Sequence, residues 1–351
     1  MLLTLVLLAV IFRTVISLYP EDNHSRQTAE GVYCNIIYSL IIFIAAFRGS
    51  GVGADTMSYI DDYHVVATMS FPEIAERFEG YWGFYFLSKV FSIFKAPLWV
   101  WFGFVEFAYV SSIVRLINKF SKDRLYSIIL FIVSGLFLFS LAGLKQILAM
   151  GIVLHSFLDY VDKKYLRSLF LIIVAYLCHP IAMVMLITFI LYYFKDKTVF
   201  PLIVIIAVGI VTIGRLTVLG YLVNFLGNDH FEDYLVLNTS YTKSTLYLYL
   251  LLLACSILFL HDYFKSSNTG KFEFSCLLIG CSFQFLASYS PALFRMSLFF
   301  TPFYLVFLPG AFDARKKKDF IFVFFKYAAL LGAIVFQLYA SRGFVFTFSF
   351  S

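Results

Sequence analysis

Long apolar runs recur from one end of the chain to the other, and each run of roughly 17–25 residues is long enough to cross a bilayer. Of the 351 residues, 61% are hydrophobic and only 14% are charged, whereas soluble globular domains carry about 25% charge. Inside lipid, a helix satisfies its own backbone hydrogen bonds. The sequence therefore predicts an all-α, polytopic membrane protein, with residues 1–351 as a single membrane domain.

The basic loops predict the topology. Lysine and arginine gather in the segments 115–124, 163–167, 195–197, 265–271 and 315–318. Positive charge in short loops marks the cytoplasmic side, and short or acidic connections alternate with these segments. We therefore expect about twelve membrane spans with both termini outside, near residues 2–18, 32–47, 97–114, 125–142, 144–161, 165–178, 181–194, 199–214, 245–262, 272–290, 292–310 and 320–340.

Two longer connections are predicted to lie outside, near 48–96 and 215–243. The first is rich in Asp and Glu and has few basic residues. Within it, residues 80–94 are short, aromatic and interrupted by Lys89, which favours an interfacial or re-entrant helix.

Composition also limits the chemistry. The net charge of +6 is spread through loops, so it does not form the basic face that nucleic acids need. The five cysteines lack C-x-x-C spacing and read as packed side chains. No His or Cys cluster has metal-ligand spacing, so we expect no metal.

The external turns carry positive groups. Lys145 and Gln146 open one span, His179-Pro180 interrupts another pair, and Arg295 follows a proline break. One helix over 165–194 would be ~45 Å long, too long for a single span, so His179 is expected at the tip of a hairpin within a cavity. Together with Arg48 and Arg215, these groups predict a site for a lipid pyrophosphate in the outer half of the bilayer.

Five segments, in order, resemble the EpsG/Wzy family of polysaccharide polymerases, over roughly residues 30–310. They are FRGSGVGADTMSYIDDY (47–63), EGYWGF (79–84), LKQILAMGI (144–152), AYLCHPIAM (175–183) and LFR (293–295) with Tyr304. The resemblance implies a GT-C-like fold of the Wzy and O-antigen ligase type. It also implies polymerisation of undecaprenyl-pyrophosphate-linked repeat units outside the cytoplasmic membrane, by inverting, metal-independent glycosyl transfer without a cofactor.

This reaction assigns roles to the candidate residues. A guanidinium fork matches phosphate oxygens two at a time, so Arg48 and Arg295 are the first choices to bind pyrophosphate, with Lys145 and Arg215 next. His179 is a candidate base. Either Asp55 or Glu79 is an alternative base, or a group that orients His179 and binds sugar hydroxyls. The remaining substrate-binding candidates are Gln146, Tyr59 and Tyr63.

The expected partners are lipid-linked glycan donor and acceptor, membrane lipid, and as candidates a chain-length regulator and a flippase; nucleic acid is not expected. Simpler interpretations stay open: Arg48 and Arg215 extend to head groups, the tyrosines form an interfacial belt, and Asp55 caps a helix. A flippase for the same lipid-linked sugar is the alternative function. A membrane acyltransferase is disfavoured, because His179 has no nearby Asp or Asn partner in sequence.

Overall fold

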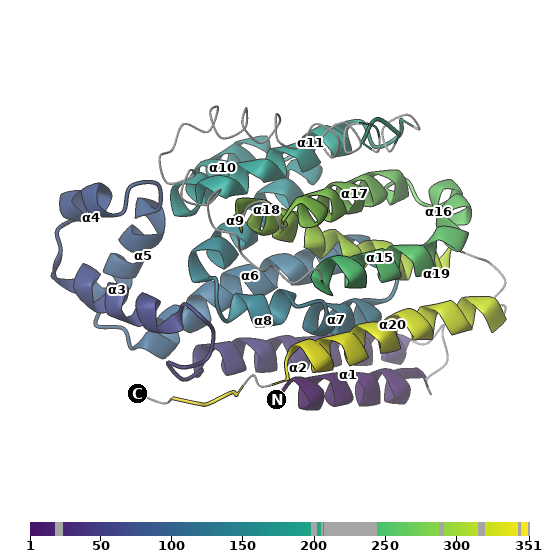
Figure 1. Ribbon diagram of the computed structural model, residues 1–351, viewed down its shortest axis with the longest axis horizontal. Coiled ribbons are helices and arrows are strands. Elements are labelled where there is room, and N and C mark those ends of the chain that lie inside the picture. Colours follow the sequence, from purple (N-terminus) through teal and green to yellow (C-terminus); the bar gives the residue numbers. More distant parts are fainter. Residues whose placement is uncertain are drawn as a thin grey trace. The chain divides into compact units, whose positions relative to one another are not determined.

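The computed structural model describes residues 1–17, 24–197, 202–204, 206, 244–287, 291–314, 320–342 and 345–349. These residues are helical almost throughout, and no strand occurs among them apart from one isolated β-bridge (Figure 1). The all-α prediction is confirmed for this part of the chain. The chain divides into two compact units: unit 1 is Met1–Met183 with Gln337–Ser351, and unit 2 is Val184–Phe336.

Unit 1 contains ten α-helices in its described part: α1 Leu2–Ser17, α2 His24–Ala46, α3 Thr56–Thr68, α4 Phe71–Arg77, α5 Trp82–Ile93, α6 Leu98–Phe120, α7 Arg124–Val133, α8 Leu136–Ser140, α9 Leu144–Val161 and α10 Tyr165–Cys178.

Two long helices, α6 and α9, pack in parallel at the centre of unit 1. Gly151 on α9 lies against the α6 backbone, where an added Cβ would be 2.8 Å from the Tyr109 Cα. Close backbone approach at a small residue is typical of packed membrane helices. Further along the same pair, Ser111 contacts His155 at 3.0 Å and Arg115 pairs with Asp159 at 2.7 Å. Because the helices run side by side in one direction, their first residues lie at the same end of unit 1.

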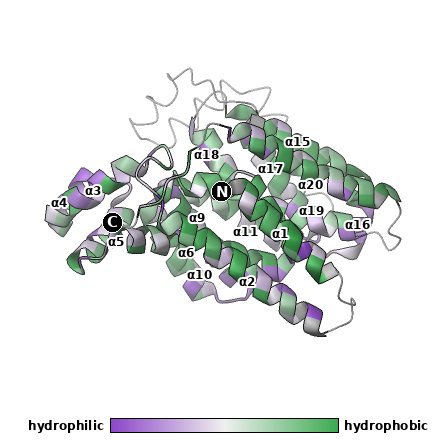
Figure 2. Ribbon diagram, turned by 90° about the horizontal axis from the view of Figure 1, so that it is seen from below, coloured by the Kyte–Doolittle hydropathy of each residue, from purple (hydrophilic) through white to green (hydrophobic). Residues whose placement is uncertain are grey.

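The short helices α3, α4 and α5 form a group beside this end (Figure 1), and α3 and α4 carry many hydrophilic residues (Figure 2). A capping box begins α4, where Glu73 accepts hydrogen bonds from the Ser70 backbone N–H and hydroxyl. Gly83 lets α5 approach α10, because an added Cβ would lie 2.8 Å from the Leu177 backbone. The α3–α5 group is thereby fixed against the end of α10, next to His179.

The C-terminal tail, residues 345–349, pairs with the segment that follows α2. Arg48 and Phe348 form an antiparallel bridge. The Gly49 N–H donates to the Thr347 carbonyl at 2.7 Å, and the Ser349 N–H donates to the Phe47 carbonyl at 2.9 Å. A Cβ on Gly49 would clash with the Thr347 side chain. The tail therefore lies at the same end of unit 1 as Arg48.

Unit 2 contains the described helices α11 Leu186–Tyr193, α15 Ser244–Ser256, α16 Leu260–Ser266, α17 Gly270–Leu286, α18 Pro291–Phe300 and α19 Tyr304–Asp313, with short 3₁₀ turns at Ile257–Phe259 and Thr301–Phe303. It also contains most of α20 Phe320–Ala340, whose last residues from Gln337 belong to unit 1. Its core forms where α17 packs against α18 and α19. Aromatic rings fill this core; Tyr249 stacks on Tyr304 with 4.6 Å between ring centroids.

Six helices of the described residues are long and apolar enough to cross a membrane: Thr28–Ala46, Leu98–Phe120, Leu144–Val161, Leu246–Ser266, Pro291–Asp313 and Val323–Ala340. Four shorter apolar helices accompany them: Leu3–Ile16, Arg124–Val133, Tyr165–Cys178 and Pro180–Tyr193. The membrane class is confirmed, and the count of about twelve spans stays a prediction. The expected span at 199–214 and the loop at 215–243 fall largely outside the described residues.

Several expected boundaries agree with the structure and others are wrong. The predicted segments 144–161 and 320–340 coincide with α9 and α20, and the short helix within 80–94 is α5. The segment 125–142, predicted as one span, is not one continuous helix, because Gly135, in a left-handed conformation with φ 86°, separates α7 from α8. The predicted span at 32–47 also began too late, since α2 starts at His24.

Candidate functional site

Lys145 lies among three tyrosines at the start of α9. Its Nζ is 5.7, 4.7 and 5.3 Å from the ring centroids of Tyr59, Tyr81 and Tyr85, and it hydrogen-bonds to the Tyr85 hydroxyl at 3.2 Å. Tyr59 comes from α3 and Tyr85 from α5, while Tyr81 is the N-cap of α5. We call these four residues the Lys145 pocket. Lys145 and Tyr81 are half-buried, whereas Tyr59 and Tyr85 are buried.

Tyr85 connects Lys145 to a carboxylate through two hydrogen bonds. Tyr85 donates from its hydroxyl to the Asp62 carboxylate at 2.6 Å. Burial raises the pKa of Tyr85, and the hydrogen bond to Asp62 raises it further, so this phenol stays protonated. Lys145 also stands in the first turn of α9, where the helix dipole already carries positive partial charge. The site thus combines a cation at a helix start with a carboxylate held through Tyr85.

His179 lies beside the Lys145 pocket. It is the C-cap of α10 and has an extended backbone, after which the chain turns into the 3₁₀ segment Pro180–Met185. The predicted break at His179-Pro180 is therefore present. Only 3% of His179 is exposed, and its ring meets the edge of Tyr81 at 5.2 Å between centroids. A buried titratable ring thus contacts the half-exposed tyrosine that also faces Lys145.

Arg48 is enclosed by protein. Only 2% of the residue is exposed, and its Cζ lies 4.1 Å from the centroid of Phe102. One terminal nitrogen donates to the Ala45 carbonyl at 2.9 Å. Burial lowers the pKa of Arg48 to about 10, while the negative charge of Glu106 opposes that change. The guanidinium therefore stays protonated at neutral pH, in a dry setting. Extension of Arg48 to lipid head groups, the simpler interpretation, is not what this structure shows.

The two carboxylates proposed beside His179 are both exposed. Asp55 is the N-cap residue of α3, although its side chain makes no capping hydrogen bond. Glu79 lies in the turn between α4 and α5. Their assignment as a base, or as groups that orient His179, stays a prediction.

Among the remaining candidates, Tyr63 is buried and donates to the Ala96 carbonyl at 2.8 Å, so its hydroxyl serves the fold. Gln146 is 3% exposed and is one of the buried residues of α9. Arg295 is half-buried on α18 of unit 2. Arg215 lies outside the described residues.

Sequence reasoning missed three site residues, namely Asp62, Tyr85 and Glu106. A sequence signal existed for each of them. Tyr81 and Tyr85 are four residues apart, and Tyr59 and Asp62 are three apart, so each pair shares one helix face. Glu106 stood alone inside an apolar run, where an ionisable residue is itself a reason to expect a site.

The opposite end of unit 1 holds paired charges. Arg13 donates to Asp123 at 2.7 and 2.5 Å, and Asp162 pairs with both Arg115 and Lys119. Hydrogen bonds from these cations, that from Lys119 above all, lower the pKa of Asp162. These residues lie in or beside the loops predicted to be cytoplasmic. The charges of these five residues are therefore paired within the protein.

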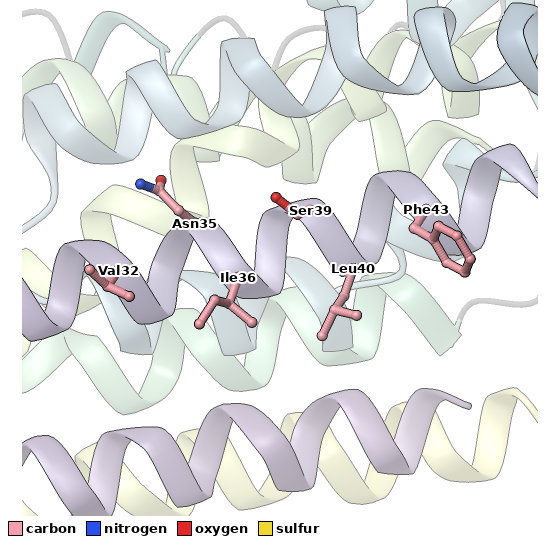
Figure 3. Close-up of a pocket in the computed structure, with 6 residues that line it drawn as sticks. All are labelled: Val32, Asn35, Ile36, Ser39, Leu40 and Phe43. Carbon is pink, nitrogen blue, oxygen red and sulfur yellow. The ribbon is translucent and has the colours of Figure 1, made fainter.

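A groove of about 560 Å³ runs along α2 and is lined by Val32, Asn35, Ile36, Ser39, Leu40 and Phe43 (Figure 3). These positions recur every three or four residues, so they share one face of a candidate span. The groove has no charged lining residue and includes none of the predicted site residues. It suits hydrocarbon and does not suit pyrophosphate.

Taken together, unit 1 provides one cation in an aromatic pocket, one buried imidazole and one buried guanidinium. Fixed cations of this kind stabilise charge that develops on a leaving phosphate, and tyrosine rings stack on sugars. Within the described ranges, no three His, Cys, Asp or Glu side chains form a group that could hold a metal. The fold and site define a multi-pass, all-helical membrane protein with a cationic, aromatic-lined site.

The family model for the EpsG family matches residues 31–350. The chain therefore belongs to the EpsG family, and the resemblance noted in the sequence is confirmed. No curated protein and no solved structure matches it significantly. Membership indicates a glycosyltransferase-like polymerase of polysaccharides in a membrane.

Proposed function

We propose that this protein polymerises undecaprenyl-pyrophosphate-linked oligosaccharide repeat units on the outer side of the cytoplasmic membrane. The growing glycan is the donor and a new lipid-linked unit is the acceptor. The observation that carries the proposal is the Lys145 pocket, where a fixed cation, sugar-sized aromatic rings and His179 meet at one end of unit 1. Family membership supports the same class of reaction.

The chemistry is an inverting displacement. An acceptor hydroxyl oxygen attacks the anomeric carbon, and the bond from that carbon to the pyrophosphate oxygen breaks, with its electron pair leaving on the phosphate. The hydroxyl proton passes to a base, for which His179 is our first choice and Asp55 or Glu79 the alternatives. Arg48 and Lys145 of unit 1 are proposed to stabilise the departing pyrophosphate; the assignments of Arg295, a first choice with Arg48, and of Arg215 stay predictions from the sequence. Gln146 and Tyr59 are proposed to bind the sugar; Tyr63 is proposed to support it through α3.

Reconstitution tests the reaction directly. Full-length protein in proteoliposomes receives purified lipid-linked repeat units, with and without a divalent-metal chelator, and gel electrophoresis resolves chain length. We expect a ladder of polymers in both conditions. Lys145→Met should abolish the ladder. Lys195→Met is the matched control, because Lys195 also lies over a tyrosine ring, 4.6 Å from the Tyr192 centroid, but belongs to unit 2. Absence of polymer from the wild-type protein would reject the proposal.

A flippase for the same lipid is the second candidate, favoured by proline-interrupted helices such as the break at His179-Pro180. It predicts that a fluorescent lipid-linked sugar crosses the proteoliposome membrane without any bond being formed. Translocation without polymer would therefore favour the flippase.

Cysteine labelling tests the proposed orientation. All five native cysteines are buried, which keeps background labelling low. Met57→Cys on α3, at a residue 55% exposed, should react with an impermeant reagent added to intact cells. Asn118→Cys, near the end of α6, should react only after permeabilisation. The reverse pattern would place the site on the cytoplasmic side.

A further inference from the structure

Glu106 is a fully buried carboxylate in the middle of α6, a helix long enough to span the membrane. One of its oxygens accepts a hydrogen bond from the Ser140 hydroxyl at 2.9 Å. The other oxygen, also buried, has no hydrogen-bond partner. Burying a charge is costly unless that charge is paired, so this oxygen requires an explanation.

Arg48 carries hydrogen-bond donors that are likewise unsatisfied. Its Nε and one terminal nitrogen are buried and have no hydrogen-bond partner. Its guanidinium stacks on Phe102, one helical turn before Glu106 on the same helix, and the Glu106 charge acts on it. Two unsatisfied donors and one unsatisfied acceptor of opposite charge therefore share one dry region of unit 1.

The absence of a direct salt bridge between them is informative. A bidentate carboxylate would occupy the donors with which a guanidinium binds phosphate. Glu106 instead supplies a countercharge from a distance and leaves Nε and the terminal nitrogen unoccupied. The arrangement resembles a prepared anion site more than a closed structural ion pair.

We infer that Glu106 is a positioning residue for pyrophosphate binding, which it promotes by holding the Arg48 guanidinium charged and oriented with two donors open to the ligand. This inference rests on the proposed function. Only 2% of Arg48 is exposed, so direct contact with the ligand requires the surrounding protein to open locally.

The test compares donor KM with kcat in the reconstituted full-length protein. Glu106→Gln removes the charge while its amide oxygen can still accept from Ser140. We expect donor KM to rise about tenfold or more, with kcat changed less than threefold. Glu106→Asp, which restores the charge, should return KM to within about threefold of wild type. An unchanged donor KM in Glu106→Gln would overturn the inference. The proposed function is judged separately, by whether the wild-type protein polymerises.

A matched control and a double variant complete the design. Glu273→Gln makes the same change at an equally buried glutamate of unit 2 and should leave KM unchanged. Arg48→Gln combined with Glu106→Gln removes both buried charges, which keeps the fold testable if the single variant fails to fold. If Glu106 acts through Arg48, the double variant should match the KM of Arg48→Gln alone; additive losses would overturn the inference.

Discussion

Two fully buried glutamates, Glu106 in unit 1 and Glu273 in unit 2, have different hydrogen-bond environments. Glu273 accepts from the Tyr263 hydroxyl at 2.6 Å and from the Thr269 hydroxyl at 2.7 Å, one donor to each carboxylate oxygen. Glu106 has one donor, Ser140, and one oxygen left over. Buried polar groups are normally satisfied. Unmet hydrogen-bonding capacity, more than burial, therefore separates a candidate functional carboxylate from a structural one.

The neighbouring groups extend this contrast. Around Glu106, the Arg48 guanidinium also keeps two unsatisfied donors. Around Glu273, Tyr263 packs its ring against Phe307 and its hydroxyl lies close to Gly310, where an added Cβ would clash. The region around Glu106 keeps unsatisfied hydrogen-bonding groups, whereas the region around Glu273 is tightly packed.

The largest expected effect tests the region around Glu106. Arg48→Ala removes the cation proposed to bind pyrophosphate, so kcat/KM for polymerisation should fall about 100-fold or more. Membrane expression and size-exclusion behaviour are measured alongside, because loss of Arg48 leaves Glu106 buried without this countercharge. If Glu273→Gln reduced kcat/KM as much as Arg48→Ala does, the distinction between the two regions would collapse.

A smaller loss of kcat/KM is expected when one hydroxyl of the Lys145 pocket is removed. Tyr85→Phe removes the hydroxyl that joins Lys145 to Asp62, and we expect roughly a tenfold fall in kcat/KM, of the order seen when one charged hydrogen bond is lost. Polymer length and initial rate are the readouts. Tyr176→Phe, at a residue 48% exposed, is the control; equal activities of the two variants would exclude this chain of hydrogen bonds from the mechanism.

The region around Glu273 should respond in stability instead of activity. Tyr263→Phe removes one hydrogen bond to the buried Glu273 carboxylate, which costs about 1–3 kcal/mol. Thermal unfolding in detergent should therefore occur at a lower temperature, with donor KM unchanged. Tyr327→Phe, at a half-exposed residue on α20, provides the reference. A change in KM without loss of stability would assign a functional part to Glu273.

The smallest effect concerns the tail pairing beside Arg48. Gly49→Ala introduces a Cβ that clashes with Thr347. Overpacking of this kind destabilises the local structure by about 1–3 kcal/mol. Proteolysis of the C-terminal tail should become faster. Adding Thr347→Ala removes the clashing hydroxyl and should restore protection. Protection unchanged by Gly49→Ala would mean that the tail does not hold this turn.

Much of the helical pattern was readable from the sequence. Residues 144–161 carry an apolar run that begins after Gly143, and α9 has the same bounds. The break at His179-Pro180 was also readable, because proline disfavours helix at the residue before it. The run at 125–142 misled, since hydropathy is blind to the left-handed Gly135 inside it.

The site was only partly readable. Motif positions pointed to Lys145, His179 and Arg48, which the structure places in unit 1 near the α3–α5 group. The partners Asp62, Tyr85 and Glu106 were not found, because contacts such as Lys145 with Tyr85 join residues far apart in the chain. Their register depends on how α3, α5 and α9 pack together, which local patterning does not encode.

By itself, then, the amino-acid sequence determined that this chain is a helical membrane protein of the EpsG family, since hydrophobic run length and motif order are properties of the linear chain. Only the tertiary structure decided that Arg48 is enclosed, that Lys145 is surrounded by tyrosines and that Glu106 is left with an unsatisfied oxygen. The physical reason is that desolvation and hydrogen-bond satisfaction belong to a position in the packed protein, where residues from separate helices exclude water together.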